Sequence, residues 1–503
     1  MLHHLASCLR IIVPPVLGVV ALGFGGSVEA RAGQTYYVST SGKDTNAGTS
    51  TAPWRHIQHA CNTVASGSTV LVETGIYNEA INVISPITLE SAPNAKPVID
   101  GTGLPVPDTN AALVLINGVS NVAVEGFEIR NYKTTNSNLV PAGIFVDGEA
   151  KNVRIQSNIV HAIENNGSTA SNINAFAISV YGNSPSGGIN NLVITQNTVY
   201  DTVTGNSETV DVDGNVSGFY ITDNIVHDVN NIGIDCIGFE GVSPIAGQDQ
   251  ARNGLVEGNT VYNVTSLHNP SYGGSQSADG IYVDGGTNIV IDRNIVHNDD
   301  IGIEVASEHH GHVASHVTVR NNLDYLSNVV GLSIGGYDST VGGTLDCTFV
   351  NNTFYGNDTT NSGSGEFQIQ YYTTGNVFKN NILDASNQGI FISVATSGTP
   401  GLVSDYNLYY TTGGPAWSWG ADTYVTLLSF QKGSKEDAHS RFGNPRFVNP
   451  GSANFKLGAG SPALGTGVNL GTEIVGTLDL DGGPRLNGST IDLGCYETAP
   501  PAA

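Results

Sequence analysis

The chain has 503 residues, of which 44 are acidic and 19 are basic, so that its formal net charge is −25 at pH 7. This balance argues against nucleic acid or an anionic membrane as a partner, because both are bound mainly through Lys and Arg. The 5 cysteines are too few and too scattered for a disulfide framework, and we expect Cys236 and Cys347, which lie in apolar patterns, to be buried free thiols.

Residues 1–32 have the pattern of an export signal. A short segment with one arginine, Arg10, precedes an apolar run over residues 11–24, and Ala30-Arg31-Ala32 is a small-x-small cleavage site. The run is too short for a confident membrane span, and no other segment is long enough. We therefore expect a secreted or periplasmic protein that is cleaved near Ala32 and has no membrane partner.

A short repeat recurs through the middle of the chain, in which two or three alternating apolar residues precede an asparagine and another apolar pair. The asparagines are separated by 39, 27, 35, 35, 28, 30 and 29 residues, and they are Asn158, Asn197, Asn224, Asn259, Asn294, Asn322, Asn352 and Asn381. Such spacing is typical of a coil that keeps its strands and varies its loops. We expect these asparagines to adopt the left-handed bend conformation and to form a hydrogen-bonded ladder along the stack.

A second short strand lies between successive asparagines, as in Gly233-Ile-Asp-Cys and Gly302-Ile-Glu-Val. These strands alternate inward apolar with outward variable residues. The sequence therefore predicts an all-β parallel β-helix, with an N-terminal cap and first coils over 33–110, a core over 111–410, and C-terminal coils and a capping segment over 411–503. A short amphipathic helix is expected over His56 to Ala65, and a separate C-terminal module is the alternative for the last segment.

The two ends of the chain carry recognisable motifs. They are Tyr36-Tyr37-Val38-Ser39, Gly42-Lys43-Asp44 and Pro53-Trp54 at the front, and Asn444-Pro445-Arg446-Phe447-Val448, Ser461-Pro462-Ala463 and Asp492-Leu493-Gly494-Cys495-Tyr496-Glu497 at the rear. On these motifs the chain resembles the pectate-lyase-like superfamily of secreted right-handed β-helix proteins, over nearly all of residues 35 to 497. The resemblance implies a right-handed coil and a carbohydrate ligand, while the motifs specify the fold more strongly than the chemistry.

Aligning the second strands places their outward residues in one column, in the order Phe145, Ser179, Asp211, Asp235, Tyr282, Glu304, Ser333 and Gln368. A neighbouring column, two positions further along each strand, reads Asp147, Tyr181, Asp213, Ile237, Asp284, Ala306 and Gly335. Asp279 is acidic where neighbouring coils have isoleucine. Stacked like charges are costly, so this concentration indicates either a function or a solvated acidic face.

In the preferred interpretation the chain is a glycoside hydrolase that acts on a polysaccharide or oligosaccharide and requires no cofactor. Two carboxylates would serve as general acid and as nucleophile or base. The preferred pair is Asp284 and Glu304, and the alternates are Asp235, Asp279 and Glu308. The residues expected to bind sugar are Tyr282, Glu240, His268, Tyr272, Arg252 and His309, and we expect a monomer.

Two other functions stay open. In a Ca²⁺-dependent polysaccharide lyase, which the resemblance implies, Asp211 and Asp213 would bind the metal together with Asp235, but no lysine falls in the outward column to act as base. A non-catalytic glycan-binding β-helix would use the same face. Zinc binding by His309, His310 and His312 is disfavoured, because sequential histidines alone are weak evidence for a metal site.

Overall fold

The computed structural model describes residues 33–107, 111–168, 173–394 and 402–498. Its strands form three long sheets and one two-stranded sheet. The expected export signal and its cleavage site lie outside the described residues. Within the described ranges, the structure contains no helix that is long and apolar enough to cross a membrane.

Sheet I has 16 strands. They are β1 (Thr35–Val38), β2 (Ser68–Val72), β5 (Ile87–Ser91), β8 (Val122–Glu125), β11 (Ala150–Gln156), β14 (Ile189–Thr195), β17 (Val216–Thr222), β20 (Arg252–Glu257), β23 (Thr287–Asp292), β26 (Val313–Ser315), β27 (Thr318–Arg320), β30 (Gly343–Leu345), β31 (Thr348–Val350), β34 (Thr373–Thr374), β35 (Val377–Lys379) and β38 (Val403–Asp405).

Sheets II and III have 13 strands each. Sheet II contains β4 (Ile81–Val83), β7 (Ala112–Asn117), β10 (Ala142–Asp147), β13 (Phe176–Gly182), β16 (Val210–Gly214), β19 (Ile234–Cys236), β22 (Asp279–Asp284), β25 (Ile301–Ala306), β29 (Val330–Ile334), β33 (Phe367–Ile369), β37 (Ile390–Val394), β40 (Ala416–Trp419) and β41 (Asp422–Tyr424). Sheet III contains β3 (Gly75–Tyr77), β6 (Pro97–Asp100), β9 (Glu128–Thr134), β12 (Ile159–Asn165), β15 (Thr198–Thr202), β18 (Ile225–Val229), β21 (Thr260–Val264), β24 (Ile295–His297), β28 (Leu323–Tyr325), β32 (Thr353–Tyr355), β36 (Ile382–Asp384), β39 (Leu408–Tyr410) and β42 (Arg441–Phe442).

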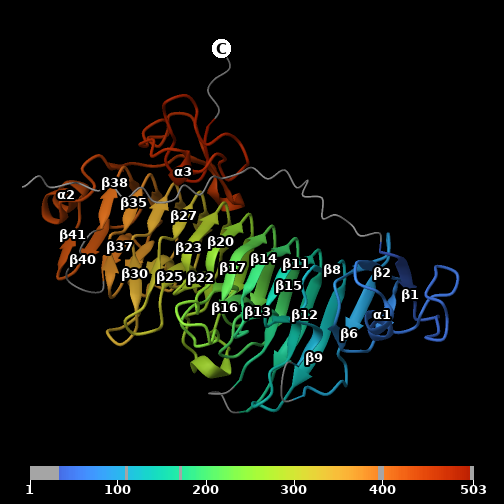
Figure 1. Cartoon of the computed structure of the whole chain (residues 1–503). Helices are drawn as coiled ribbons and strands as arrows, with labels where there is room; N and C mark the ends of the chain where they lie inside the picture. The colour runs from blue at the N-terminus through green and yellow to red at the C-terminus, as the bar shows by residue number, and fades with distance from the viewer. Residues whose placement is uncertain (1–32, 108–110, 169–172, 395–401, 499–503) are drawn as a thin grey trace, which may run out of the picture. The chain divides into compact units, whose positions relative to one another are not determined.

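Each full coil places one strand in sheet II, the next in sheet I and the third in sheet III. Consecutive strands such as β10, β11 and β12 therefore lie in different sheets, whereas β10 pairs in parallel with β7 and β13. Figure 1 shows these strands side by side from the blue N-terminal coils to the orange C-terminal ones. The predicted parallel β-helix is confirmed, and its interior is filled by the inward apolar residues of all three sheets, such as Val146, Ile155 and Val160 of one coil.

The predicted asparagine ladder runs along the corner between sheets I and III. Asn259 Nδ2 donates to Asn294 Oδ1 (3.0 Å) and to the Ile221 carbonyl (2.9 Å), and its Oδ1 accepts from the backbone N–H and Nδ2 of Asn224 (2.9 and 3.0 Å). The series extends to Asn407. The expectation that the ladder asparagines adopt the left-handed backbone conformation is wrong. The residue before each asparagine adopts it, as Gln196 does (φ 57°), because the buried asparagine side chain must point inward to reach the next coil.

Sheet III carries a stack of alternating histidine and tyrosine rings on its outer side. Neighbouring rings are nearly parallel, with centroids 4.6 to 5.1 Å apart, in the order His161, Tyr200, His227, Tyr262, His297 and Tyr325. Because each ring pairs in register with the next, the stack fixes the same coils whose sheet II strands bear the acidic residues.

Helices lie near both ends of the strand stack. The predicted N-terminal helix is α1 (Ile57–Thr63), which buries Ile57 and Ala60. Near the other end, α2 (Leu427–Ser434) buries Phe430, whose ring stacks on Trp417 at 5.4 Å. The cysteines at 61, 236, 347 and 495 are all buried and free, as expected for Cys236 and Cys347.

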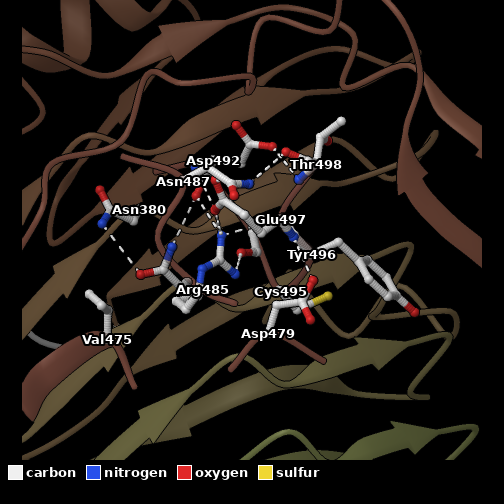
Figure 2. A network of polar contacts seen from close by, with 12 residues as sticks. Asn380, Val475, Asp479, Arg485, Asn487, Asp492, Cys495, Tyr496, Glu497 and Thr498 are labelled. Carbon is white, nitrogen blue, oxygen red and sulfur yellow. Dashed lines mark hydrogen bonds and ion pairs between the residues drawn. The ribbon is translucent and has the colours of Figure 1, made fainter. Parts of the chain in front are cut away.

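The closing segment, from about residue 444, lies over the asparagine corner of the later coils. It contains the two-stranded sheet of β43 (Phe447–Asn449) and β44 (Asn454–Leu457), the short helix α3 (Thr472–Val475) and the 3-10 turn η3 (Pro450–Ser452). Another 3-10 turn, η2 (Pro270–Tyr272), lies outside this segment, in the loop between β21 and β22. Figure 2 shows the polar network at its centre. The guanidinium of Arg485, which is fully buried, binds Glu497 Oε2 (2.7 Å) and the Gly494 carbonyl (2.9 Å), so that the last residues of the segment are held around one charge.

Candidate active site

The outward residues of sheet II form a central column along the coils. Direct strand pairing joins its successive members in the order expected from the sequence: Phe145, Ser179, Asp211, Asp235, Tyr282, Glu304, Ser333 and Gln368. Neighbouring strands in such sheets are about 4.8 Å apart. The acidic members of the column therefore lie along one wall of the coil, as the strand alternation in the sequence predicts.

A distal column lies two residues further along each strand. It includes Asp213 and Asp284 but is interrupted between them, because β19 ends before Ile237, which instead forms a bridge with Gly285. Tyr282 pairs with Glu304, and Asp284 pairs with Ala306, so Asp284 and Glu304 are diagonal neighbours on β22 and β25. Side chains at diagonal positions of neighbouring strands are about 7–8 Å apart.

A third column lies three residues before the central one, where the coils turn into sheet II. It reads Phe176, Glu208, Ile232, Asp279 and Ile301. Asp279 was predicted as part of the site, whereas Glu208 was missed. Burial, together with neighbouring charges that include Asp213, raises the pKa of Glu208 to about 8. The same signal that identified Asp279, a carboxylate where other coils have apolar residues, would have found Glu208.

The carboxyl groups of Glu304 and Asp279 interact across two successive coils, so that each affects the pKa of the other. Ser333 Oγ donates a hydrogen bond to Glu304 Oε1 (2.8 Å). Burial raises the pKa of Glu304 to about 7, and burial together with Glu304 raises the pKa of Asp279 well above its usual range. The pair therefore holds at least one proton at neutral pH, which is the condition for a general acid.

Asp211 and Asp235 pair directly on β16 and β19, and Asp213 follows Asp211 by two residues. Ser179 Oγ donates to Asp211 Oδ2 (3.0 Å), whereas the Oδ1 atoms of all three aspartates are buried and have no hydrogen-bond partner among the residues that the structure describes. Burial raises the pKa of Asp213 to about 7 and those of Asp211 and Asp235 well above their usual range. Their oxygens are of the type that Ca²⁺ prefers.

Two loops contribute side chains next to Asp284. The backbone N–H of Glu308 donates to Asp284 Oδ1 (2.7 Å), and His309 Nε2 lies 3.0 Å from Glu240 Oε1. Between the same loops, the ring of Phe239 stacks on His312 with centroids 4.0 Å apart. Glu240, Asp284 and His309 thus form a group of potential metal ligands, which differs from the aspartate set expected from the sequence.

The other residues predicted to bind sugar differ in how deeply they are buried. Tyr282 is buried against Ile232 and Ala306, while burial and Asp284 raise the pKa of its hydroxyl. Half-buried Tyr272 lies near the acidic residues, since Glu308 and Asp279 are among the charges that raise its pKa. His268 is exposed in the loop after β21.

Arg252 lies at the start of β20 in sheet I, not on the acidic wall. Its guanidinium donates to Asn215 Oδ1 (2.7 Å) and to the Gln250 carbonyl (3.0 Å). These two hydrogen bonds hold the guanidinium away from the acidic wall, so Arg252 is not positioned to act as the base in proton abstraction.

A hollow of about 540 Å³ lies nearer the N-terminus, with Asn117, Asp147 and Asn183 in its lining. Asp147 belongs to β10 and Asp284 to β22, so the hollow is four coils away from the Asp284–Glu304 pair. The candidate site is thus defined by its buried carboxylates and not by this hollow.

Two sequence comparisons bear on the family. The family model described as "Pel9A-like, right handed beta helix region" matches residues 36–220. The protein named "Uncharacterized protein YwoF" from Bacillus subtilis (strain 168) is 36% identical over 443 residues, which cover 86% of this chain and 93% of the relative.

Solved structures share the fold at low identity. XylC in complex with xylose matches with a TM-score of 0.51 and 11% identity, covering 92% of this chain and 98% of that one. The GH136 lacto-N-biosidase from Eubacterium ramulus matches with a TM-score of 0.51 and 15% identity, covering 82% of this chain and 67% of that one. The predicted right-handed parallel β-helix is thereby confirmed, and the chain belongs to the family of the Bacillus subtilis YwoF protein.

Proposed function

We propose that this protein is a secreted glycoside hydrolase that cleaves a polysaccharide or oligosaccharide along the acidic wall of sheet II. The observation that carries the proposal is the group of buried carboxyl groups in which Glu304 interacts with Asp279 and accepts a hydrogen bond from Ser333, with Asp284 diagonal to Glu304 on the preceding coil. Glycosidic bonds are cleaved by two carboxyl groups, one protonated and one ionised, on either side of the bond.

In this proposal Glu304 is the general acid. Its pKa of about 7 keeps it protonated at slightly acidic pH, and Asp279 and Ser333 fix the orientation of its carboxyl group. A proton donor of this pKa is well matched to neutral conditions. Glu304 would give its proton to the oxygen of the leaving sugar.

Asp284 is the proposed base. Burial and the charge of Glu308 raise the pKa of Asp284 well above its usual range, whereas the Glu308 N–H that binds its Oδ1 lowers this pKa and orients the carboxylate. A diagonal separation of about 7–8 Å leaves room for a water molecule between base and sugar, which favours inversion of configuration at the anomeric carbon. Tyr282, between the two residues in the columns, would line the sugar site.

The names of the structural relatives support a saccharide substrate, since one was solved with xylose and the other is a lacto-N-biosidase. They do not specify the sugar for this chain. The formal net charge of −25 favours neutral or cationic glycans over polyuronates, because it repels a polyanion.

A Ca²⁺-dependent lyase is the second candidate. It is favoured by the buried Oδ1 atoms of Asp211, Asp213 and Asp235, which have no hydrogen-bond partner in the described part of the chain. These aspartates would hold the ion, which would neutralise the carboxylate of a uronate when bound. Against it, Arg252 is bound to Asn215 and Gln250, and the central and distal columns contain no lysine.

The test is incubation of the protein with a panel of neutral, amino-sugar and uronate glycans, with and without a calcium chelator. A hydrolase releases reducing ends without unsaturated uronate, and chelation has no effect. Unsaturated products that vanish with chelator would establish the lyase, and retention of a glycan without cleavage would establish a binding protein. Glu304→Gln should abolish cleavage while the exposed control Glu149→Gln retains it.

A further inference from the structure

Three side chains from separate segments meet above the distal column. Asp284 ends β22, Glu240 lies in the loop between β19 and β20, and His309 lies in the loop after β25. One ligand atom from each lies within 4.8 Å of the other two. Asp284 is buried, with 4% of its surface exposed, whereas Glu240 is exposed and His309 half-buried. The group therefore opens toward solvent above an anchored carboxylate.

From this geometry we propose a binding site for one divalent transition-metal ion of the Zn²⁺ class, with Glu240, Asp284 and His309 as ligands. Zinc bonds to carboxylate oxygen and imidazole nitrogen are about 2.0–2.2 Å long, so tetrahedral ligand atoms lie about 3.4 Å apart. Glu240 and His309 already approach to 3.0 Å. The remaining ligand atoms lie at most 4.8 Å apart, and Glu240 and His309 both stand on loops, where rotation of their side chains toward Asp284 shortens these distances without moving a strand.

Neighbouring contacts orient the ligands as metal sites require. The Glu308 N–H holds Asp284 Oδ1 at 2.7 Å, which leaves Oδ2 for the ion. The Phe239–His312 stack keeps the two loops together beside the site. Hydrogen bonds and packing contacts from the residues that surround metal ligands raise metal affinity, because they fix the orientation of the ligands.

The surrounding charge also favours a cation. Asp213 interacts electrostatically with Glu240, and Asp235 interacts with Asp284. Both aspartates are 2% exposed, and each has an Oδ1 atom without a hydrogen-bond partner among the described residues. His309 supplies the one ion pair that Glu240 makes in the described part of the chain. A dication would lower the cost of ionising these buried carboxyl groups, because it supplies the opposite charge that the protein does not.

The histidine decides the class of metal. Ca²⁺ prefers six to eight oxygen ligands, whereas an imidazole nitrogen with two carboxylates suits Zn²⁺ and its neighbours in the transition series. This site is distinct from the aspartates proposed for Ca²⁺ in the lyase alternative. It also gives His309 a role as a metal ligand, which the neighbouring histidines in the sequence were too weak as evidence to predict.

Binding would have two consequences. The ion would join the two loops, which are otherwise linked by side-chain contacts, and it would occupy the carboxylate that the proposed function uses as base. The second consequence rests on the proposed function, and predicts that the metal inhibits hydrolysis. The first does not depend on any enzymatic activity.

The test uses tag-free protein stripped of metal by a chelator and dialysed. Calorimetric titration with ZnCl₂ should show one site per chain, and His309→Ala and Glu240→Gln should each weaken it at least 10-fold. The matched control is His310→Ala, an exposed neighbour in the same loop, which should bind Zn²⁺ as the unaltered chain does. Zn²⁺ should raise the melting temperature of the unaltered chain and of the control, but not of His309→Ala.

Absence of Zn²⁺ binding, tighter binding of CaCl₂ than of ZnCl₂, or unchanged affinity in both folded ligand variants would overturn the proposal. Circular dichroism establishes that each variant is folded. Zn²⁺ binding without cleavage of any glycan would leave the metal site standing and reject the hydrolase. Glycan cleavage without Zn²⁺ binding would support the hydrolase and reject the metal site.

Discussion

The buried carboxyl groups of Glu304 and Asp279 interact although they belong to different coils and to different columns of sheet II. Asp279 stands where the neighbouring coils have Ile232 and Ile301, so its carboxyl group replaces an apolar side chain beside Glu304. A protonated Asp279 donates to Glu304 and thereby stabilises the Glu304 carboxylate. This contact, more than the number of acidic residues, distinguishes the wall from a solvated acidic surface.

Replacing Glu304 by Gln should lower kcat by about 10²- to 10⁴-fold, the usual contribution of a general acid. The comparison is with Glu149→Gln, which removes an exposed carboxylate and should leave kcat within twofold. Steady-state assays on the glycan identified by the panel provide the measurement. A Glu304→Gln variant with ordinary kcat would show that another group donates the proton.

Asp279→Ile should move the alkaline limb of the pH–rate profile upward from about 7, the pKa of Glu304. The substitution removes the interaction with Asp279 that lowers the pKa of Glu304, and its loss favours the protonated acid. Isoleucine already occupies this position in two neighbouring coils, so the fold should accept it. A limb that stays in place or moves down would contradict the assignment of Glu304 as the titrating group.

Stability should decrease as pH rises from about 4 to 8. The pKa values of Asp213 and Glu304 in the folded chain are about 7, above the value near 4 of an unfolded carboxyl, so the folded state binds more protons over this interval. Each raised pKa therefore favours the folded state at low pH, and that advantage is lost as pH approaches the folded value. For Asp213, which is 2% exposed, the change is up to about 4 kcal/mol.

Melting temperatures at pH 5, 6, 7 and 8 measure this slope. Asp213→Asn should flatten it, because the amide does not ionise, whereas Glu149→Gln should leave it nearly unchanged while removing the same formal charge. An equal effect of the two variants would attribute the slope to the overall charge of −25 and not to burial.

Alternation along the strands was enough to predict the central column from the sequence. Each outward residue follows an inward apolar one at a period of two, and coil spacing brings the strands into register, so Asp211, Asp235 and Glu304 were placed correctly. The distal column was predicted less well, because the early end of β19 at Ile237 has no signal in the alternation.

Contacts between loops and across bends could not be predicted in this way. His309 and Glu240 are separated by 69 residues, and each lies in a loop of irregular length, so neither period nor spacing relates them. Asp279 and Glu208 lie where the chain turns into sheet II, and side-chain direction at a turn does not follow the strand alternation. The Glu304–Asp279 pair, on which the proposed chemistry depends, is therefore visible only in the structure.

Asn259→Ala should destabilise the coil stack by about 3 kcal/mol, because it leaves the Ile221 carbonyl and the Asn224 N–H buried without partners. The midpoint of urea unfolding gives the measurement. The control Asn62→Ala changes an exposed residue of α1 and should shift stability by about 0.5 kcal/mol or less. Equal midpoints for the two variants would mean that the ladder contributes little beyond its backbone pairing.

Arg485→Ala should release the closing segment from the coils. Removing the guanidinium leaves Glu497 and the carbonyl of Gly494 without their partner, and breaking a buried ion pair costs about 3–5 kcal/mol. The buried thiol of Cys495, in the same segment, reports the release. In the unaltered chain it should resist an aromatic disulfide reagent, and in Arg485→Ala it should react, with mass spectrometry identifying the modified residue.

The control is Lys456→Ala, which removes an exposed ion pair with Asp481. Such pairs contribute about 0–1 kcal/mol, so Cys495 should stay protected in this variant. Modification of Cys61, Cys236 and Cys347 measures whether the coil stack itself has opened. Reaction of Cys495 alone means that the closing segment detaches as a unit, whereas simultaneous reaction of all four thiols would mean that Arg485 stabilises the whole β-helix and not one segment.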